Sequence, residues 1–179
     1  MAILKAPIVA EDHAQGPEDA EVILVEYGDY ECPHCGRAYS IVKRVREHFG
    51  KNLRLIFRNF PLGEMHPHAV AAAETAEFAG AHGKFWEMHD LLFENQPQLG
   101  EPLFLELART LKLSATALQK ALTERTFEAR VRADFSGGVR SGVNGTPTFF
   151  INGHRHDNSF EFETLVSAIQ GAMTKAKSA

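Results

Sequence analysis

Cys32 and Cys35 lie where a predicted strand ends and a predicted helix begins. Residues 22–28 are apolar almost without a break, which is typical of a strand that is buried on both faces. Apolar side chains then recur at helical spacing, at Tyr39, Val42, Val45 and Phe49. Pro33 suits the first position of this helix, because proline lacks the backbone N–H that would have no partner there. A C-x-x-C sequence in a strand–turn–helix setting indicates a redox-active pair of thiols.

The position of the two thiols also favours reactivity. At the start of a helix, unpaired backbone N–H groups and the helix dipole stabilise negative charge, such as that of a thiolate. The chain has 2 cysteines, both in this motif, so a scaffold held together by several disulfides is excluded. A zinc site would need further ligands from the 9 histidines, and the strand-to-helix setting does not favour one. We therefore interpret the pair as redox-active, and the remaining alternative is two reduced cysteines without a role.

The length and charge of the chain limit its fold and its partners. With 179 residues, of which 44% are hydrophobic, it can bury a full core, as one domain or as a domain with a large insertion. Its formal net charge of −4 does not suit a polyanion, so we expect no nucleic-acid partner. We also expect no membrane span, because no segment approaches the ~20 apolar residues that cross a bilayer.

The first 20 residues do not have the pattern of a secretory signal. Their apolar run at 7–10 is followed by acidic residues, whereas a signal needs an apolar stretch of roughly 7–15 residues. As written, the sequence predicts a cytoplasmic protein. A signal peptide that had been removed and replaced by Met1 would leave the same sequence, and the protein would then be periplasmic or otherwise extracytoplasmic.

The rest of the chain alternates between β and α patterns. Further strands are predicted at 7–9 (at a sheet edge), 53–59, 148–152 and 154–156. The strand at 53–59 should run parallel to 22–28, because a crossover helix separates the two. Asn152–Gly153 predicts a hairpin turn between the last two strands.

Helices are predicted at 69–81, 84–94, 102–112, 115–123, around 127–135 and from near 160 onward. Ser114 is expected to cap one of these helices, and Gly137–Gly138 is expected to loosen the chain.

This order of elements resembles the thioredoxin fold. Without the helical segment it reads β-α-β followed by β-β-α, with C-P-H-C at the first strand-to-helix turn. The inserted helices and the string Gly145–Gly153, GTPTFFING, are similar to the DsbA-like family of thiol–disulfide oxidoreductases. The resemblance implies an α/β, thioredoxin-like fold with an α-helical insertion. It places a discontinuous thioredoxin-like domain at 1–64 and 141–179, and an inserted helical subdomain at 65–140.

The resemblance also implies roles for individual residues. Cys32 would be the attacking thiolate, and Cys35, one turn further along the helix, would resolve the mixed disulfide. Their redox-active disulfide would need no other cofactor. Pro147 matches the family's cis proline, and the backbone of Thr146 would pair with an extended substrate segment. The alternative for Pro147 is an ordinary trans proline that opens the strand.

Charged and titratable residues flank the motif. His34 would stabilise the Cys32 thiolate, or would be an exposed spacer without effect. Asp29 and Glu31 would oppose the thiolate as nearby anions, although water in the loop should screen them. Glu26 is a carboxylate in an apolar strand, so burial should raise its pKa. It also matches the acidic residue that acts as proton acceptor for the second cysteine in the DsbA-like pattern; the alternative is an ion pair with Lys or Arg at the sheet edge.

Two further groups of residues are given structural interpretations. The histidines at 66, 68, 82 and 89 lack a cysteine or carboxylate at ligand spacing, so solvated surface side chains are the better interpretation than a metal site. Phe85 and Trp86 are expected in the core of the helical segment rather than on a peptide-binding surface.

Together these residues predict a protein disulfide oxidoreductase of the DsbA-like type. Its partners would be cysteine-containing protein or peptide substrates, and glutathione or a protein that resets the cysteines. Oxidase, reductase and isomerase directions all stay open. The alternatives are a glutathione-linked reductase or conjugating enzyme of the same fold and, as a non-enzyme, a peptide-binding chaperone.

Overall fold

The computed structural model describes residues 2–177 of the chain, and side chains as far as residue 174. The chain divides into two compact units. The first comprises Met1–Gly28, Arg37–Arg58 and Gly137–Ala179, and the second comprises Asp29–Gly36 and Asn59–Ser136. Sequence analysis placed the divisions at 64/65 and 140/141. The observed units divide at 58/59 and 136/137, and the segment with both cysteines groups with the helical unit.

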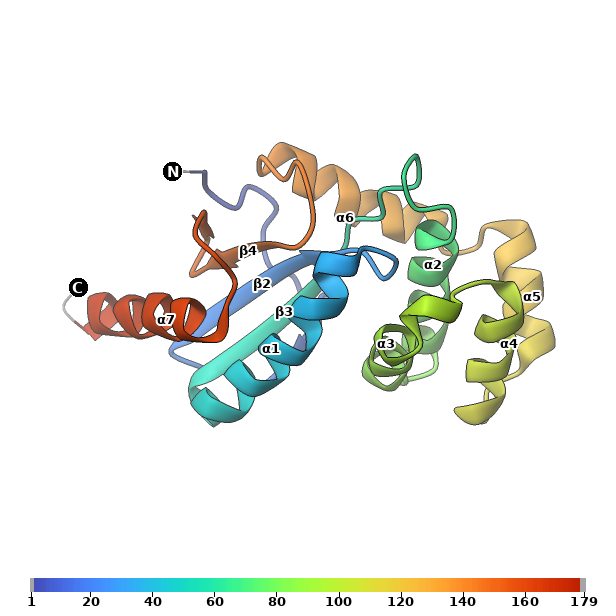
Figure 1. Ribbon diagram of the computed structural model, residues 1–179, viewed down its shortest axis with the longest axis horizontal. Helices are drawn as coiled ribbons and strands as arrows, with labels where there is room; N and C mark the ends of the chain where they lie inside the picture. Colours follow the sequence, from blue (N-terminus) through green and yellow to red (C-terminus); the bar gives the residue numbers. More distant parts are fainter. Residues whose placement is uncertain (1, 178–179) are drawn as a thin grey trace. The chain divides into compact units, whose positions relative to one another are not determined.

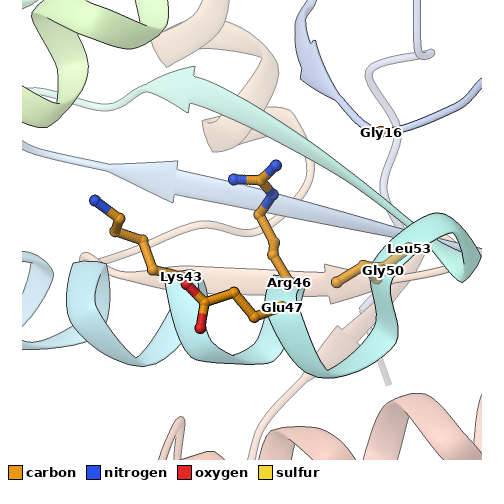
Figure 2. Close-up of a pocket in the computed structure, with 6 residues that line it drawn as sticks. All are labelled: Gly16, Lys43, Arg46, Glu47, Gly50 and Leu53. Atoms are coloured by element: carbon orange, nitrogen blue, oxygen red, sulfur yellow. The ribbon is translucent and has the colours of Figure 1, made fainter.

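The first unit is built on a five-stranded sheet with the order β1-β3-β2-β4-β5 (Figure 1). The strands are β1 His13–Gln15, β2 Val22–Gly28, β3 Leu53–Asn59, β4 Thr148–Ile151 and β5 His154–His156. The pairs β1–β3, β2–β4 and β4–β5 are antiparallel. Figure 2 shows the arrows of β2 and β3 pointing the same way, which confirms the predicted parallel pair.

Strands β2 and β3 are mostly apolar and almost completely buried. Every residue of β2 except Ile23, and every residue of β3 except Arg54, is buried. The predicted hairpin turn is confirmed, because Asn152 and Gly153 both have positive φ, 46° and 79°, as the tight turn requires. The Asn152 side chain also accepts a hydrogen bond from the backbone N–H of Ile23, which fastens the turn to β2.

The edge strand predicted at 7–9 is wrong, because β1 lies at His13–Gln15. The backbone groups of that segment are bound elsewhere. The N–H of Val9 donates to the Asp12 carboxylate at 2.8 Å, and the carbonyl of Pro7 accepts from Arg58 at 2.6 Å. Arg58 forms a buried ion pair with Asp12, so this segment is held by side chains rather than by a β ladder.

The helices of the two units follow the predicted periodicity. They are α1 Pro33–Phe49, α2 Ala69–Ala81, α3 Phe85–Glu94, α4 Glu101–Thr110, α5 Ala115–Glu124, α6 Glu128–Arg140 and α7 Phe162–Lys177. Short 3₁₀ turns lie at Gly50–Asn52 and Gln96–Gln98. The Ser114 hydroxyl accepts a hydrogen bond from the N–H of Ala117, which confirms the predicted N-cap.

Gly137–Gly138 does not loosen the chain, because both residues lie within α6. A Cβ atom on Gly137 would lie 3.0 Å from that of Ala6, so glycine allows the amino-terminal segment to pass close to the helix.

The second unit consists mainly of helices packed around α2. This helix is rich in alanine and buried along most of its length, which lets its neighbours approach closely. Phe85 is buried in the same unit, as predicted, and Trp86 is half-buried against it. None of the helices in the described part of the chain is long and apolar enough to cross a membrane.

Candidate dithiol active site

The two cysteines lie at the start of α1, which begins at Pro33 as predicted. The Cys32 carbonyl accepts the helical hydrogen bond from the N–H of Gly36 at 3.0 Å, so Cys32 occupies the N-terminal cap position. No disulfide joins Cys32 and Cys35. Both are buried, with 5% and 0% of their surface exposed, whereas Pro33 and His34 between them are exposed.

The two thiols are expected to react at different rates with an alkylating reagent. Cys32 retains some exposure at the helix start, whereas Cys35 is fully buried and its sulfur accepts a hydrogen bond from the N–H of Asp29. Because the thiolate is the nucleophile, mild alkylation near neutral pH should label Cys32 at least roughly tenfold faster. Mass spectrometry of the partly labelled protein measures the ratio, and equal labelling would contradict the roles assigned to the two residues.

Asp29 organises the turn that precedes the motif. Its carbonyl accepts from the N–H of Cys32 at 3.2 Å, and its N–H donates to the Cys35 sulfur at 3.4 Å. Its carboxylate accepts from the N–H groups of Glu31 at 2.8 Å and Leu62 at 2.9 Å. Asp29 therefore joins both cysteines to the loop that follows β3.

The expectation that water screens Asp29 is wrong, because Asp29 is 1% exposed. A buried carboxylate needs a counter-charge, since charge interactions are stronger in a medium of low dielectric constant. His66 supplies it, with its Nδ1 atom 2.7 Å from Oδ2 of Asp29.

His66 is therefore not a solvated surface side chain, because only 15% of its side chain is exposed. Burial by itself would lower the pKa of His66, but the hydrogen bond and the negative charge of Asp29 outweigh it, with Cys32 and Glu31 adding to the effect. The net result is a raised pKa.

The other three histidines have different surroundings. His89 is also buried, with its Nδ1 atom 3.1 Å from the Tyr30 hydroxyl, so the surface interpretation is wrong there too. His68 and His82 are exposed, as predicted. Among the described residues no three or more His, Cys, Asp or Glu side chains form a group that could hold a metal ion.

Gln96 is a site residue that sequence reasoning missed. Its side-chain amide donates to the carbonyls of Tyr30 at 2.7 Å and Cys32 at 2.9 Å. A Cβ atom on Gly36 would lie 2.3 Å from Oε1 of Gln96, so the glycine after Cys35 makes room for this side chain. Gln96 lies 64 positions after Cys32 in the sequence, so no local pattern reveals the contact.

Glu26 lies in β2 of the first unit and is buried, as predicted. Burial raises the pKa of Glu26 from 4.5 to about 8. Its Oε1 atom has no hydrogen-bond partner among the described residues. The strand that carries it lies in the middle of the sheet, so the alternative of an ion pair at the sheet edge finds no support.

Thr146 and Pro147 lie directly before β4, also in the first unit. The Thr146–Pro147 peptide bond, for which the resemblance implied a cis proline, is cis. The register pairs Glu26 with Phe149 and Tyr27 with Thr148. The strand that begins after Pro147 is therefore hydrogen-bonded to the strand that carries Glu26.

A pocket of about 240 Å³ lies elsewhere in the first unit, beside the second half of α1 (Figure 2). Its lining residues are Gly16, Lys43, Arg46, Glu47, Gly50 and Leu53. None of them is a predicted site residue, so we do not include this pocket in the dithiol site.

Residues 9–171 match the family described as thioredoxin. The chain belongs to the thioredoxin family. BdbD from Bacillus subtilis, in its oxidised form, superposes on this family member with a TM-score of 0.88 at 25% identity, covering 97% of this chain and 98% of BdbD. The alpha-DsbA1 protein of Wolbachia pipientis superposes with a TM-score of 0.84 at 19% identity, covering 98% and 96%. These matches confirm the thioredoxin-like fold and the predicted resemblance to DsbA-type proteins.

The curated relatives with similar sequences are named as Na(+)/H(+) antiporters. The chain is 44% identical over 161 residues to Na(+)/H(+) antiporter NhaA 1 of Salinispora arenicola, a match that covers 90% of this chain and 24% of the relative. This thioredoxin-family chain thus spans about a quarter of the length of the curated relatives it matches.

Proposed function

We propose that the protein is a thiol–disulfide oxidoreductase that exchanges disulfides with cysteine-containing proteins or peptides. The observation that supports this most strongly is the pair of cysteines, Cys32 and Cys35, at the start of α1 in a thioredoxin-family chain. The helix start favours a thiolate at Cys32, and the sulfur of Cys35 lies one turn further along the helix.

When the protein reduces a substrate disulfide, the exchange has two steps. The Cys32 thiolate attacks one sulfur of a substrate disulfide, so that a mixed disulfide forms and the other substrate sulfur leaves as a thiolate. Cys35 then loses its proton and attacks the Cys32 sulfur, which releases the second substrate thiolate and forms the Cys32–Cys35 disulfide. The substrate gains two electrons and the protein loses two. A protein dithiol or two molecules of glutathione then reduce the Cys32–Cys35 disulfide by the same steps in reverse and become the disulfide themselves, so no other cofactor is needed.

For a substrate that is being oxidised, the same steps run backward. The protein then gains two electrons and the substrate acquires the disulfide. The chemistry is symmetrical, so the direction depends on the reduction potentials of the substrate and of the partner that resets the protein.

We assign Glu26 as the group that accepts the proton of Cys35. A general base works best when its pKa lies near that of the group it serves and near the working pH. The raised pKa of Glu26, about 8, is close to the ordinary thiol pKa of ~8.5 and supports this assignment. His34 is exposed between the two cysteines, where a positive charge would stabilise the Cys32 thiolate.

We place the substrate backbone beside Thr146 and Pro147, in the manner of an added β-strand. The support is the match of this segment to the family motif and its position directly before β4. Main-chain pairing of this kind accepts many sequences, which suits an enzyme that acts on different cysteine-containing substrates.

The proposed function predicts that exchange activity depends on both thiols. The protein should accelerate disulfide exchange in a fluorescent peptide with two cysteines, and the Cys32→Ser, Cys35→Ser double variant should show the uncatalysed rate. Two results together would favour the peptide-binding chaperone. The wild type would show no exchange activity, and the double variant would still suppress aggregation of an unfolded protein. Turnover that requires glutathione as a substrate would favour the glutathione-linked enzyme.

A further inference from the structure

The loop after β3 is tied to the segment that leads into the cysteines. The carboxylate of Asp29 accepts from the N–H of Leu62, and that of Glu31 accepts from the N–H of His68 at 2.6 Å. Between these two anchors, His66 contacts Asp29 through its Nδ1 atom at 2.7 Å. The imidazole is thereby held beside the turn that carries Cys32.

The charges around His66 are predominantly negative. The groups that act on the imidazole are Asp29, Glu31 and Cys32, all from the segment between β2 and the first turn of α1. On its own loop, Glu64 and His68 are exposed to solvent. A protonated His66 therefore lies among two carboxylates and the sulfur that the mechanism requires as a thiolate.

We propose that His66 is a positioning residue of the dithiol site, which as an imidazolium neutralises Asp29 and stabilises Cys32 as a thiolate. The inference rests on the proposed function, because it assigns Cys32 as the nucleophile. The backbone of Asp29 is hydrogen-bonded to both cysteines, so the Asp29 carboxylate lies close to them. Without the imidazolium, this buried negative charge would oppose a thiolate at Cys32. His66 thus removes the penalty that a buried anion beside the motif would otherwise impose.

The coupling between the two groups must be reciprocal. If the Cys32 thiolate raises the pKa of His66, then protonated His66 lowers the pKa of Cys32 by the same amount. Oxidation removes the thiolate, so the pKa of His66 should fall when the Cys32–Cys35 disulfide forms. At a pH near the pKa of His66, formation of the disulfide should then release part of a proton from His66.

The test compares His66→Gln with His68→Gln. Glutamine at 66 keeps an N–H donor for Asp29 but has no charge, whereas His68 lies on the same loop with an exposed side chain. The pH dependence of thiolate absorbance should show a Cys32 pKa about one unit higher in His66→Gln, so that at a pH below it the thiolate is about tenfold scarcer. The protein should also become more reducing by ~30 mV, which corresponds to a tenfold change in the redox equilibrium. His68→Gln should change neither value.

A second measurement uses the unmodified protein. NMR titration of His66 should give a lower pKa in the oxidised form than in the reduced form, by about the shift that His66→Gln produces at Cys32. A folded His66→Gln protein with an unchanged Cys32 pKa would overturn the inference. If that variant does not fold, equal His66 pKa values in the two redox forms would overturn it. Neither titration depends on turnover, so a wild type without exchange activity would count against the proposed function and not against this coupling.

Discussion

Replacing Cys35 by serine is expected to accumulate mixed disulfides between the protein and its substrates, whereas replacing Cys32 by serine should prevent them from forming. In the first variant Cys32 still attacks, but the buried partner that would resolve the intermediate is missing. In the second the nucleophile is missing, and Cys35 is 0% exposed and cannot reach a substrate. Turnover should fall to the uncatalysed rate in both.

Non-reducing electrophoresis and mass spectrometry measure the trapped species under mildly oxidising conditions. The Cys32→Ser, Cys35→Ser double variant is the control for adducts that form without either thiol. If Cys32→Ser traps as much material as Cys35→Ser, the nucleophile has been assigned to the wrong residue.

Replacing Glu26 by glutamine is expected to stabilise the protein at neutral pH. In the unfolded chain this carboxyl ionises as the pH passes 4.5, but in the folded protein burial keeps it protonated until about 8. Between these two values the folded state binds the proton more tightly, so the free energy of unfolding falls as the pH rises, by ~1.4 kcal/mol per pH unit. Glutamine is always neutral and avoids this loss, which amounts to ~3 kcal/mol at neutral pH.

Urea unfolding across the pH range tests this expectation. The gain in stability from Glu26→Gln should disappear below the ordinary carboxyl pKa of 4.5, where both states of the wild type are protonated. Glu21→Gln, which replaces an exposed residue just before β2, is the matched control and should change stability little at any pH.

Disulfide exchange should slow in Glu26→Gln, because an amide cannot accept the Cys35 proton. Unchanged exchange rates across pH would make Glu26 a structural carboxylate.

The elements that sequence analysis placed correctly are those with local signals. The apolar run at 22–28 predicted β2, and Pro33 marked the first residue of α1. Asn152–Gly153 predicted the turn before β5. In each case the property that decides the structure, such as a fixed φ, an absent N–H or a side-chain period, belongs to a few neighbouring residues.

The errors arise where distant residues decide. The segment 7–9 has a strand-like composition, but Asp12 and Arg58 bind its backbone groups. Glycine at 137 was expected to loosen the chain, but it lies within a helix, and its missing side chain allows Ala6 to pack closely against that helix. A glycine can break a helix or allow another segment to pack closely against it. Only the position of that other segment, which the tertiary structure gives, distinguishes these two roles.

The site also has some features that neighbouring residues decide and others that distant residues decide. The amino-acid sequence by itself determined the two thiols, their place at a helix start and the buried carboxylate in the preceding strand, because these follow from spacing along one stretch of chain. Only the tertiary structure decided that Asp29 is buried, that His66 is its counter-charge and that Gln96 holds the turn. The physical reason is that the effect of a charge depends on what excludes water from it and what lies beside it. For Asp29 that partner comes from 37 residues further along the chain, beyond the reach of any local pattern.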